Sequence, residues 1–236
     1  MKKLSSDFIK GLGILLITGL VFTGCNMSVN KSIHIRDGET VDHGATTVNG
    51  SITIGDNCTV RGNCSTVNGR IKVGGNSEVK SLKTVNMGVS VGKNTVVEGS
   101  IGTVNGSVTC DDGVKVDRDI TTVNGSISCG KGVRIEEGLA NINGNVTLRN
   151  TLVKENIKTH NGNVTLLDKS TVEGDILIKR SRSSSRRWRT LDITISGDSV
   201  VKGDIIVKDR NQKVKVILSQ GGRVEGKITN AEVVKE

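Results

Sequence analysis

The sequence predicts an all-β protein: a single-stranded parallel β-helix, or triangular β-solenoid, with 18–19 residues per coil and about ten coils. Three observations support this prediction. A short VNG motif recurs at a nearly constant spacing, the residues after it alternate between apolar and polar, and the 236-residue chain has 30 Gly, no Pro and 1% aromatic residues. A long fixed period is typical of repeat architectures, and alternation with a period of two is typical of strands. The alternative, a propeller, needs about 40 residues per blade.

Residues 1–24 have the pattern of a signal peptide and are left out of the fold prediction. An apolar stretch at 11–22 ends in FTGC, with Cys25 as the last residue. Small residues before a Cys resemble a bacterial lipobox, which implies cleavage before Cys25 and a diacylglycerol on its sulfur. Residues 25–29 are then the lipidated N-terminus of a cell-envelope protein, and Asn26 implies the outer membrane if the host is Gram-negative. An ordinary signal peptide with an incidental Cys is the alternative.

The asparagine of each VNG-like unit sets the period across residues 30–178, the expected range of the regular coils. These asparagines are Asn49, Asn68, Asn86, Asn105, Asn124, Asn143 and Asn161. Equivalent residues stack in a solenoid, so we expect a structural ladder of side-chain amide hydrogen bonds. We also expect each ladder asparagine to be left-handed, and the glycine after it to let the chain turn.

Each coil divides into three short strands, with Gly, Asn and Asp at the corners, where turns prefer them. If the valine before each asparagine faces the core, the threonine before that valine faces solvent, because side chains alternate along a strand. This predicts an outward column of threonines. Its members are Thr47, Thr66, Thr84, Thr103, Thr122 and Thr159.

The regular pattern stops after residue 178. Residues 179–190 lack apolar alternation and are rich in Arg and Ser, so we expect a basic loop between coils, with strands resuming over 191–236. The anion-binding candidates in this loop are Arg180, Arg182, Arg186, Arg187, Trp188 and Arg189. Arg suits bidentate recognition of phosphate or carboxylate, and Trp suits a membrane interface. The expected ligands are lipid headgroups, lipopolysaccharide or a cell-wall polymer; an envelope location argues against nucleic acid, and a solvated loop is the alternative.

Several segments resemble the bactofilins, the polymer-forming β-helical proteins of bacteria. The resemblance rests on STVEGDILI (170–178), SVVKGDIIV (199–207), RVEGKI (223–228) and VVEGSIGTVNGSV (96–108), and it covers about 90–228. It implies a β-helical scaffold without catalytic residues or cofactor. It also implies end-to-end assembly through terminal coils, often at a membrane.

Four cysteines follow Cys25, and each replaces an apolar core residue of other coils. They are Cys58, Cys64, Cys110 and Cys129. This pattern favours small buried side chains. Disulfides are the alternative in an oxidising envelope: Cys110–Cys129, whose Cα atoms would be about 4.8 Å apart in neighbouring coils, and Cys58–Cys64. Their spacing matches no zinc pattern, so we expect no metal site.

Glu98, Asp117 and Glu136 share one outward position in successive coils, where Lys115 and Arg134 offset their repulsion. No convergent carboxylate pair departs from the repeat, so we expect no catalytic residues. The sequence therefore predicts a non-enzymatic, lipid-anchored scaffold that needs no cofactor and self-assembles through coil ends as a homo-oligomer or filament. A binding module or adhesin that uses the basic loop is the alternative, and a polysaccharide-active enzyme is the third.

Overall fold

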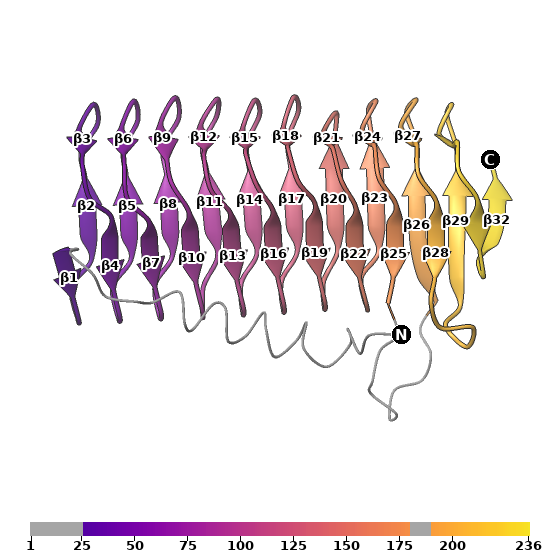
Figure 1. Cartoon of the computed structure of the whole chain (residues 1–236), viewed down its shortest axis with the longest axis horizontal. Helices are drawn as coiled ribbons and strands as arrows, with labels where there is room; N and C mark the ends of the chain where they lie inside the picture. The colour runs from indigo at the N-terminus through magenta and orange to yellow at the C-terminus, as the bar shows by residue number, and fades with distance from the viewer. Residues whose placement is uncertain (1–25, 180–189) are drawn as a thin grey trace.

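The computed structural model describes residues 26–179 and 190–236, which form three parallel β-sheets and no helix. Each coil gives one short strand to each sheet, so the strands of a sheet follow one another along the long axis of a rod (Figure 1). The predicted parallel β-solenoid of about ten coils is confirmed. The predictions for Cys25 and for residues 180–189 lie outside the described residues.

The three sheets are named A, B and C in the order in which the chain meets them. Sheet A contains β1 (Asn26–Ser28), β4 (Ala45–Thr47), β7 (Cys64–Thr66), β10 (Leu82–Thr84), β13 (Ile101–Thr103), β16 (Ile120–Thr122), β19 (Leu139–Asn141), β22 (Ile157–Thr159), β25 (Ile176–Ile178), β28 (Ile205–Val207) and β31 (Ile228–Thr229). Sheet B contains β2 (Ile33–Ile35), β5 (Ile52–Ile54), β8 (Ile71–Val73), β11 (Val89–Val91), β14 (Val108–Cys110), β17 (Ile127–Cys129), β20 (Val146–Arg149), β23 (Val164–Leu167), β26 (Leu191–Ile195), β29 (Val214–Leu218) and β32 (Glu232–Lys235). Sheet C contains β3 (Thr40–Val41), β6 (Thr59–Val60), β9 (Glu78–Val79), β12 (Val96–Val97), β15 (Lys115–Val116), β18 (Arg134–Ile135), β21 (Leu152–Val153), β24 (Thr171–Val172), β27 (Val200–Val201) and β30 (Arg223–Val224).

The core consists of aliphatic columns that run along the rod. In the three-residue strands of sheets A and B the first and third residues point inward, and equivalent residues pair in register, as Val108 does with Ile127. Inward residues such as Ile101 and Ile120 have no exposed surface. Among the described residues the buried core cluster runs from Ile35 to Val216.

The prediction that the threonine column faces solvent is wrong. Each of these threonines is the third residue of its sheet A strand and points inward, with at most 1% of its surface exposed. Most of their hydroxyl groups donate to a carbonyl oxygen of the preceding coil, as Thr66 Oγ1 does to Gly50 O at 2.8 Å. The valine that follows, such as Val67, begins the turn and is half-exposed.

The ladder asparagines do not have positive φ, which corrects the prediction of left-handed backbone there. The left-handed column lies at the corner between sheets B and C, where Asn57 has φ 58° and Gly132 has φ 73°. The glycine after each ladder asparagine serves close packing of coils instead. A Cβ atom on Gly125 would lie 1.9 Å from the carbonyl oxygen of Gly106 in the preceding coil.

We predict that Gly125→Ala destabilises the rod by about 1–3 kcal/mol, because the added methyl group forces neighbouring coils apart. Gly132→Asn is the control: asparagine occupies the equivalent left-handed position in other coils, and no atom lies within 3.8 Å of the added Cβ. Denaturant unfolding of residues 26–236 measures both. Equal stability of the two variants would contradict the close-approach argument.

Candidate functional site

The asparagine side chains of eight successive coils form a hydrogen-bonded ladder at the corner between sheets A and B. In each step the Nδ2 group donates to Oδ1 of the asparagine one coil earlier, for example Asn124 to Asn105 at 2.9 Å. The series begins with Asn49 donating to Asn30 at 2.6 Å and ends with Asn161 donating to Asn143 at 2.8 Å. The steps between them are 2.6–3.0 Å long. The ladder spans every residue of the predicted set and adds Asn30.

The acidic column at the corner between sheets C and A is matched by basic side chains. Lys80 pairs with Glu98, Lys115 Nζ lies 2.7 Å from Asp117 Oδ1, and Arg134 Nε lies 2.5 Å from Glu136 Oε1. Lys154 also pairs with Glu136. Hydrogen bonds from Lys154 and Arg134 lower the pKa of Glu136 to about 2. This corner is therefore a balanced ionic network.

The four described cysteines are buried thiols. Cys110 and Cys129 are cross-strand neighbours on β14 and β17. A hydrogen bond with Cys110, followed by burial, raises the pKa of the Cys129 thiol. Cys58 Sγ donates to the carbonyl oxygen of Arg36 at 2.9 Å, whereas Cys64 stacks between Ala45 and Leu82 in sheet A. Both disulfides stay predictions.

Three neighbouring polar groups break the regular pattern near the end of the ladder. Asn141 takes the place of a column threonine, and its Nδ2 donates to Gly125 O at 2.8 Å. Among the described residues, Asn141 Oδ1, Thr159 Oγ1 and His160 Nδ1 are buried without a hydrogen-bond partner. Burial, and then the nearby charge of Lys179, lower the pKa of His160 below its ordinary value of 6.5.

The corner between sheets A and B is enlarged at the C-terminal end. In regular coils four residues, such as 48–51, join the two strands, whereas six residues, 208–213, join β28 to β29. This second extension is not among the features predicted from the sequence, although KDRNQK (208–213) in place of VNG signals it. Lys208, Arg210 and Lys213 are exposed there, and none forms an ion pair among the described residues.

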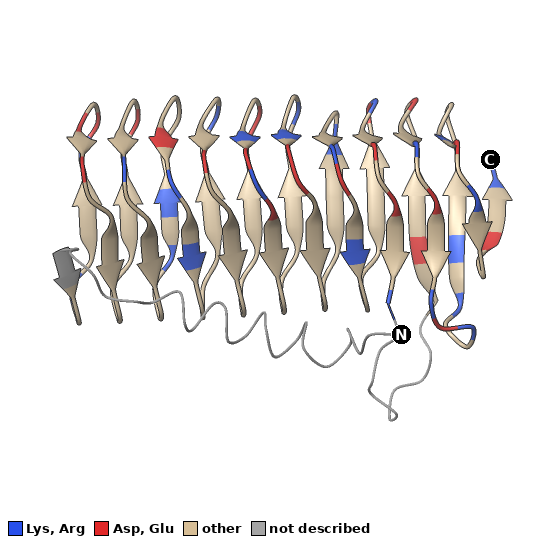
Figure 2. Ribbon diagram, in the orientation of Figure 1, with Lys and Arg blue, Asp and Glu red and all other residues tan. Residues whose placement is uncertain are grey.

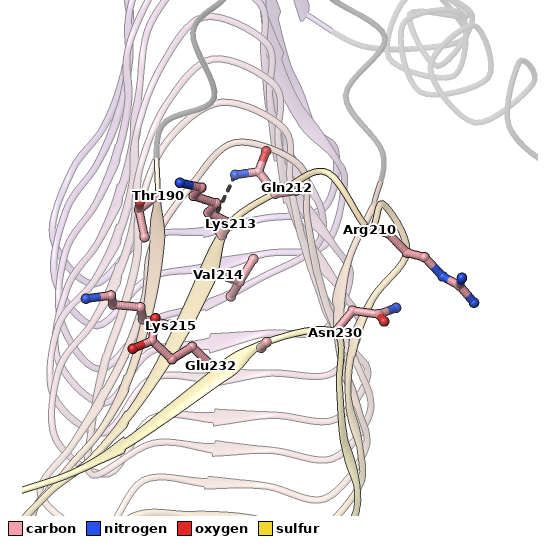
Figure 3. A pocket seen from close by; sticks show the side chains of 9 residues that line it. Thr190, Arg210, Gln212, Lys213, Val214, Lys215, Asn230 and Glu232 are labelled. Atoms are coloured by element: carbon pink, nitrogen blue, oxygen red, sulfur yellow. Dashed lines mark hydrogen bonds between the residues drawn. The ribbon is translucent and has the colours of Figure 1, made fainter.

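A shallow hollow of about 740 Å³ lies beside this extension, where the last coil turns directly from β31 to β32. Val214 lies between the labelled side chains, and Arg210 extends away from them (Figure 3). Lys215 is flanked in register by Asp192 and Glu232. Three cations, Arg210, Lys213 and Lys215, therefore line the hollow together with one carboxylate, Glu232.

The basic loop predicted at 179–190 is described only at its ends, Lys179 and Thr190; the arginines and Trp188 lie outside the described residues. Burial, and then Lys158, lower the pKa of Lys179. Within 26–179 and 190–236 no group of three His, Cys, Asp or Glu is arranged to hold a metal ion. The same ranges contain no helix long and apolar enough to span a bilayer.

The fold and its continuous side-chain columns define a parallel β-solenoid protein. No protein family, curated protein or solved structure matches the chain.

We predict that Asn105→Ala destabilises the rod by about 1–2 kcal/mol, because it removes one hydrogen bond to Asn86 and one from Asn124. Asn163→Ala is the control, since the Asn163 side chain lies outside the ladder and accepts one longer hydrogen bond, from the backbone N–H of Asp192 at 3.2 Å. Urea unfolding compares the two. A larger loss for Asn163→Ala would refute a stabilising role of the ladder.

We predict that His160→Val flattens the pH dependence of stability between pH 8 and 5.5. Because the folded pKa of His160 is lowered, the unfolded chain binds more protons as the pH falls through about 6.5, and this destabilises the fold. Valine is the residue found at this position in most other coils. Thermal unfolding against pH measures the slope, and replacing the exposed His34 by Thr should leave it unchanged. An unaltered slope in His160→Val would contradict the assignment.

Proposed function

We propose that this protein is a non-enzymatic, lipid-anchored scaffold of the bacterial cell envelope that associates with further copies through its coil ends. The open C-terminal coil carries this proposal. Its strands β30, β31 and β32 each pair with only one neighbour in the described residues, which leaves their outer backbone groups as edges. Val233 is 43% exposed, and Val224 and Ile228 are only partly buried.

The C-terminal coils with a V-x-G-x-I pattern, such as RVEGKI (223–228), resemble bactofilins, and this resemblance supports assembly through coil ends. Val224, Gly226 and Ile228 of the RVEGKI segment lie at the solenoid end, in the last turn of sheets C and A. The lipobox pattern at Cys25 supports the anchor, and β1 begins at the next residue. The rod would therefore start directly at the membrane.

The two ends of the rod match only in part. Continuing the columns onto a second copy, head to tail, stacks Val224 on Val41 and Val233 on Ile33. Lys235, however, continues the core column of Ile195 and Leu218. An inward-directed Lys is one of the means by which proteins limit association at sheet edges. We therefore propose weak, concentration-dependent association that Lys235 restrains.

We predict that residues 26–236 reversibly form oligomers as concentration rises, that Lys235→Leu strengthens this association by about tenfold or more, and that Val233→Glu weakens it. Leucine removes the charge that the interface would otherwise desolvate. Static light scattering over a concentration series measures the masses. If all three proteins stay monomeric at the highest concentration, coil-end association is excluded.

A second candidate function is binding to an anionic surface. The exposed Lys208, Arg210 and Lys213, which lack ion-pair partners among the described residues, favour it. Their position beside the ends of the predicted basic loop gives the C-terminal coils a positive corner.

A further inference from the structure

Winding the chain into a rod separates its charges into two sides. The A–B edge consists of sheets A and B and the corner between them, in the first eight coils: residues 26–35, 45–54, 64–73, 82–91, 101–110, 120–129, 139–148 and 157–167. The C side consists of the intervening residues as far as 175: sheet C and its two corners. Arg149, the last residue of β20, is assigned to the C side because its guanidinium forms an ion pair with Asp168.

The A–B edge carries positive charges and no carboxylate. Its charged residues are Lys31, Arg70, Lys72, Lys83 and Lys158. All 16 carboxylates between residues 26 and 175 lie on the C side, together with 11 cations. Figure 2 shows this separation in the first eight coils. Red segments lie at the corner between sheets B and C and in the segments that lead from sheet C to sheet A, whereas β8, β10 and β22 carry blue bands without red.

The two sides also differ in how their charges are paired. Every ion pair between residues 26 and 178 in the described chain joins two C-side residues. None of the five cations of the A–B edge takes part in one. The C side therefore combines these ion pairs with a net charge of 11 − 16 = −5, whereas the positive charges of the A–B edge have no ion-pair partner in the described chain.

The A–B edge is extended along the rod. Lys31 and Arg70 project from the corner, Lys72 from sheet B, and Lys83 and Lys158 from sheet A. The outward residues between them on sheet B are largely hydroxyl-bearing, as Thr53, Ser90 and Thr109 are. Beyond the eighth coil the same side carries both signs of charge, with Lys208 and Arg210 at the corner, Asp209 beside them and Asp192 on sheet B. From Lys31 to Lys158 these charges spread over about 35 Å of rod by the strand spacing, which suits an extended partner better than a small ligand.

We propose that the A–B edge binds an anionic phospholipid membrane, along which the rod lies flat. Lys and Arg near an anionic bilayer are attracted to its surface, and hydroxyl groups can hydrogen-bond to phosphate oxygens. With the C side turned away, the carboxylates do not face the headgroups. The edge thus matches the membrane in charge, extent and hydrogen-bonding chemistry.

The proposed lipid anchor supports this orientation, and to that extent the inference rests on the proposed function. Cys25 directly precedes β1, so an anchor there is separated from the A–B corner by one three-residue strand, about 10 Å at the usual rise per residue. A tether that short gives the cations a high effective concentration at the membrane. The surface itself should bind without the lipid.

The test compares two variants of residues 26–236 with equal loss of net charge. The edge variant replaces Arg70, Lys72, Lys83 and Lys158 by Gln. The control variant replaces Arg36, Lys93, Lys131 and Lys169 by Gln; these C-side cations form no side-chain ion pair in the described chain. Co-sedimentation with phosphatidylcholine vesicles, with and without phosphatidylglycerol, measures affinity at low and at physiological ionic strength.

We expect the unmodified protein to bind only the vesicles that contain phosphatidylglycerol, and salt to weaken this binding. The edge variant should bind at least about tenfold more weakly, and the control variant within about twofold of the unmodified protein. Equal losses in both variants would show that net charge alone matters and would overturn the proposal. Unchanged binding of the edge variant would also overturn it, since another segment would then hold the membrane.

Soluble polyphosphate tests the competing partner, an anionic polymer. If the edge variant loses affinity for polyphosphate but not for vesicles, the A–B edge recognises a polymer and the membrane proposal fails. Should the edge variant unfold, the double variant Lys72→Gln/Lys83→Gln, with Lys93→Gln/Lys131→Gln as its control, gives the same comparison. These assays use unlipidated protein below its association range, so their failure is distinct from failure of the anchor or of coil-end assembly.

Discussion

Backbone hydrogen bonds between successive coils are the interaction on which the rest of this structure depends. The three sheets hold equivalent residues of neighbouring coils in register, so the aliphatic columns, the threonine hydroxyls and the asparagine ladder all form together. A single coil has too little interior to bury its own apolar side chains, and the coils on either side complete its core. The close spacing of coils also explains why glycine follows each ladder asparagine. At Gly125, for example, the carbonyl oxygen of Gly106 in the preceding coil occupies the space that a side chain would need.

The repeat period was enough to predict the fold and the ladder residues, because in a solenoid a residue type that recurs at the coil period occupies the same position in every coil. It did not show where each strand ends. If each sheet A strand is taken to end at the valine after the threonine, the predicted side of every threonine changes from the core to solvent. This is why the prediction for Thr47 and its equivalents is wrong. The sequence contains two asparagine columns, and only the backbone angles distinguish the left-handed Asn57 column from the ladder.

Separation of charge was likewise hidden in the linear sequence. Cations and carboxylates alternate along the chain at short intervals, and local stretches look balanced. Folding sorts them by their position within the period, which places Lys83 of β10 and Glu98, the residue after β12, on different sides of the same coil. A rod with one net negative side and one positive side has a preferred orientation against a charged surface, and this links the repeat to the function proposed for it in the envelope.

The ladder has a direction, since every amide donates toward the N-terminal end. Aligned amides in a hydrogen-bonded chain polarise one another, so their small dipoles add along the axis instead of cancelling. Asn30 forms the donor terminus of this row, and the oxygen of Asn161 forms the acceptor terminus. The repeated asparagine thereby gives a nearly uniform column an electrical polarity, with its positive pole at the first coil.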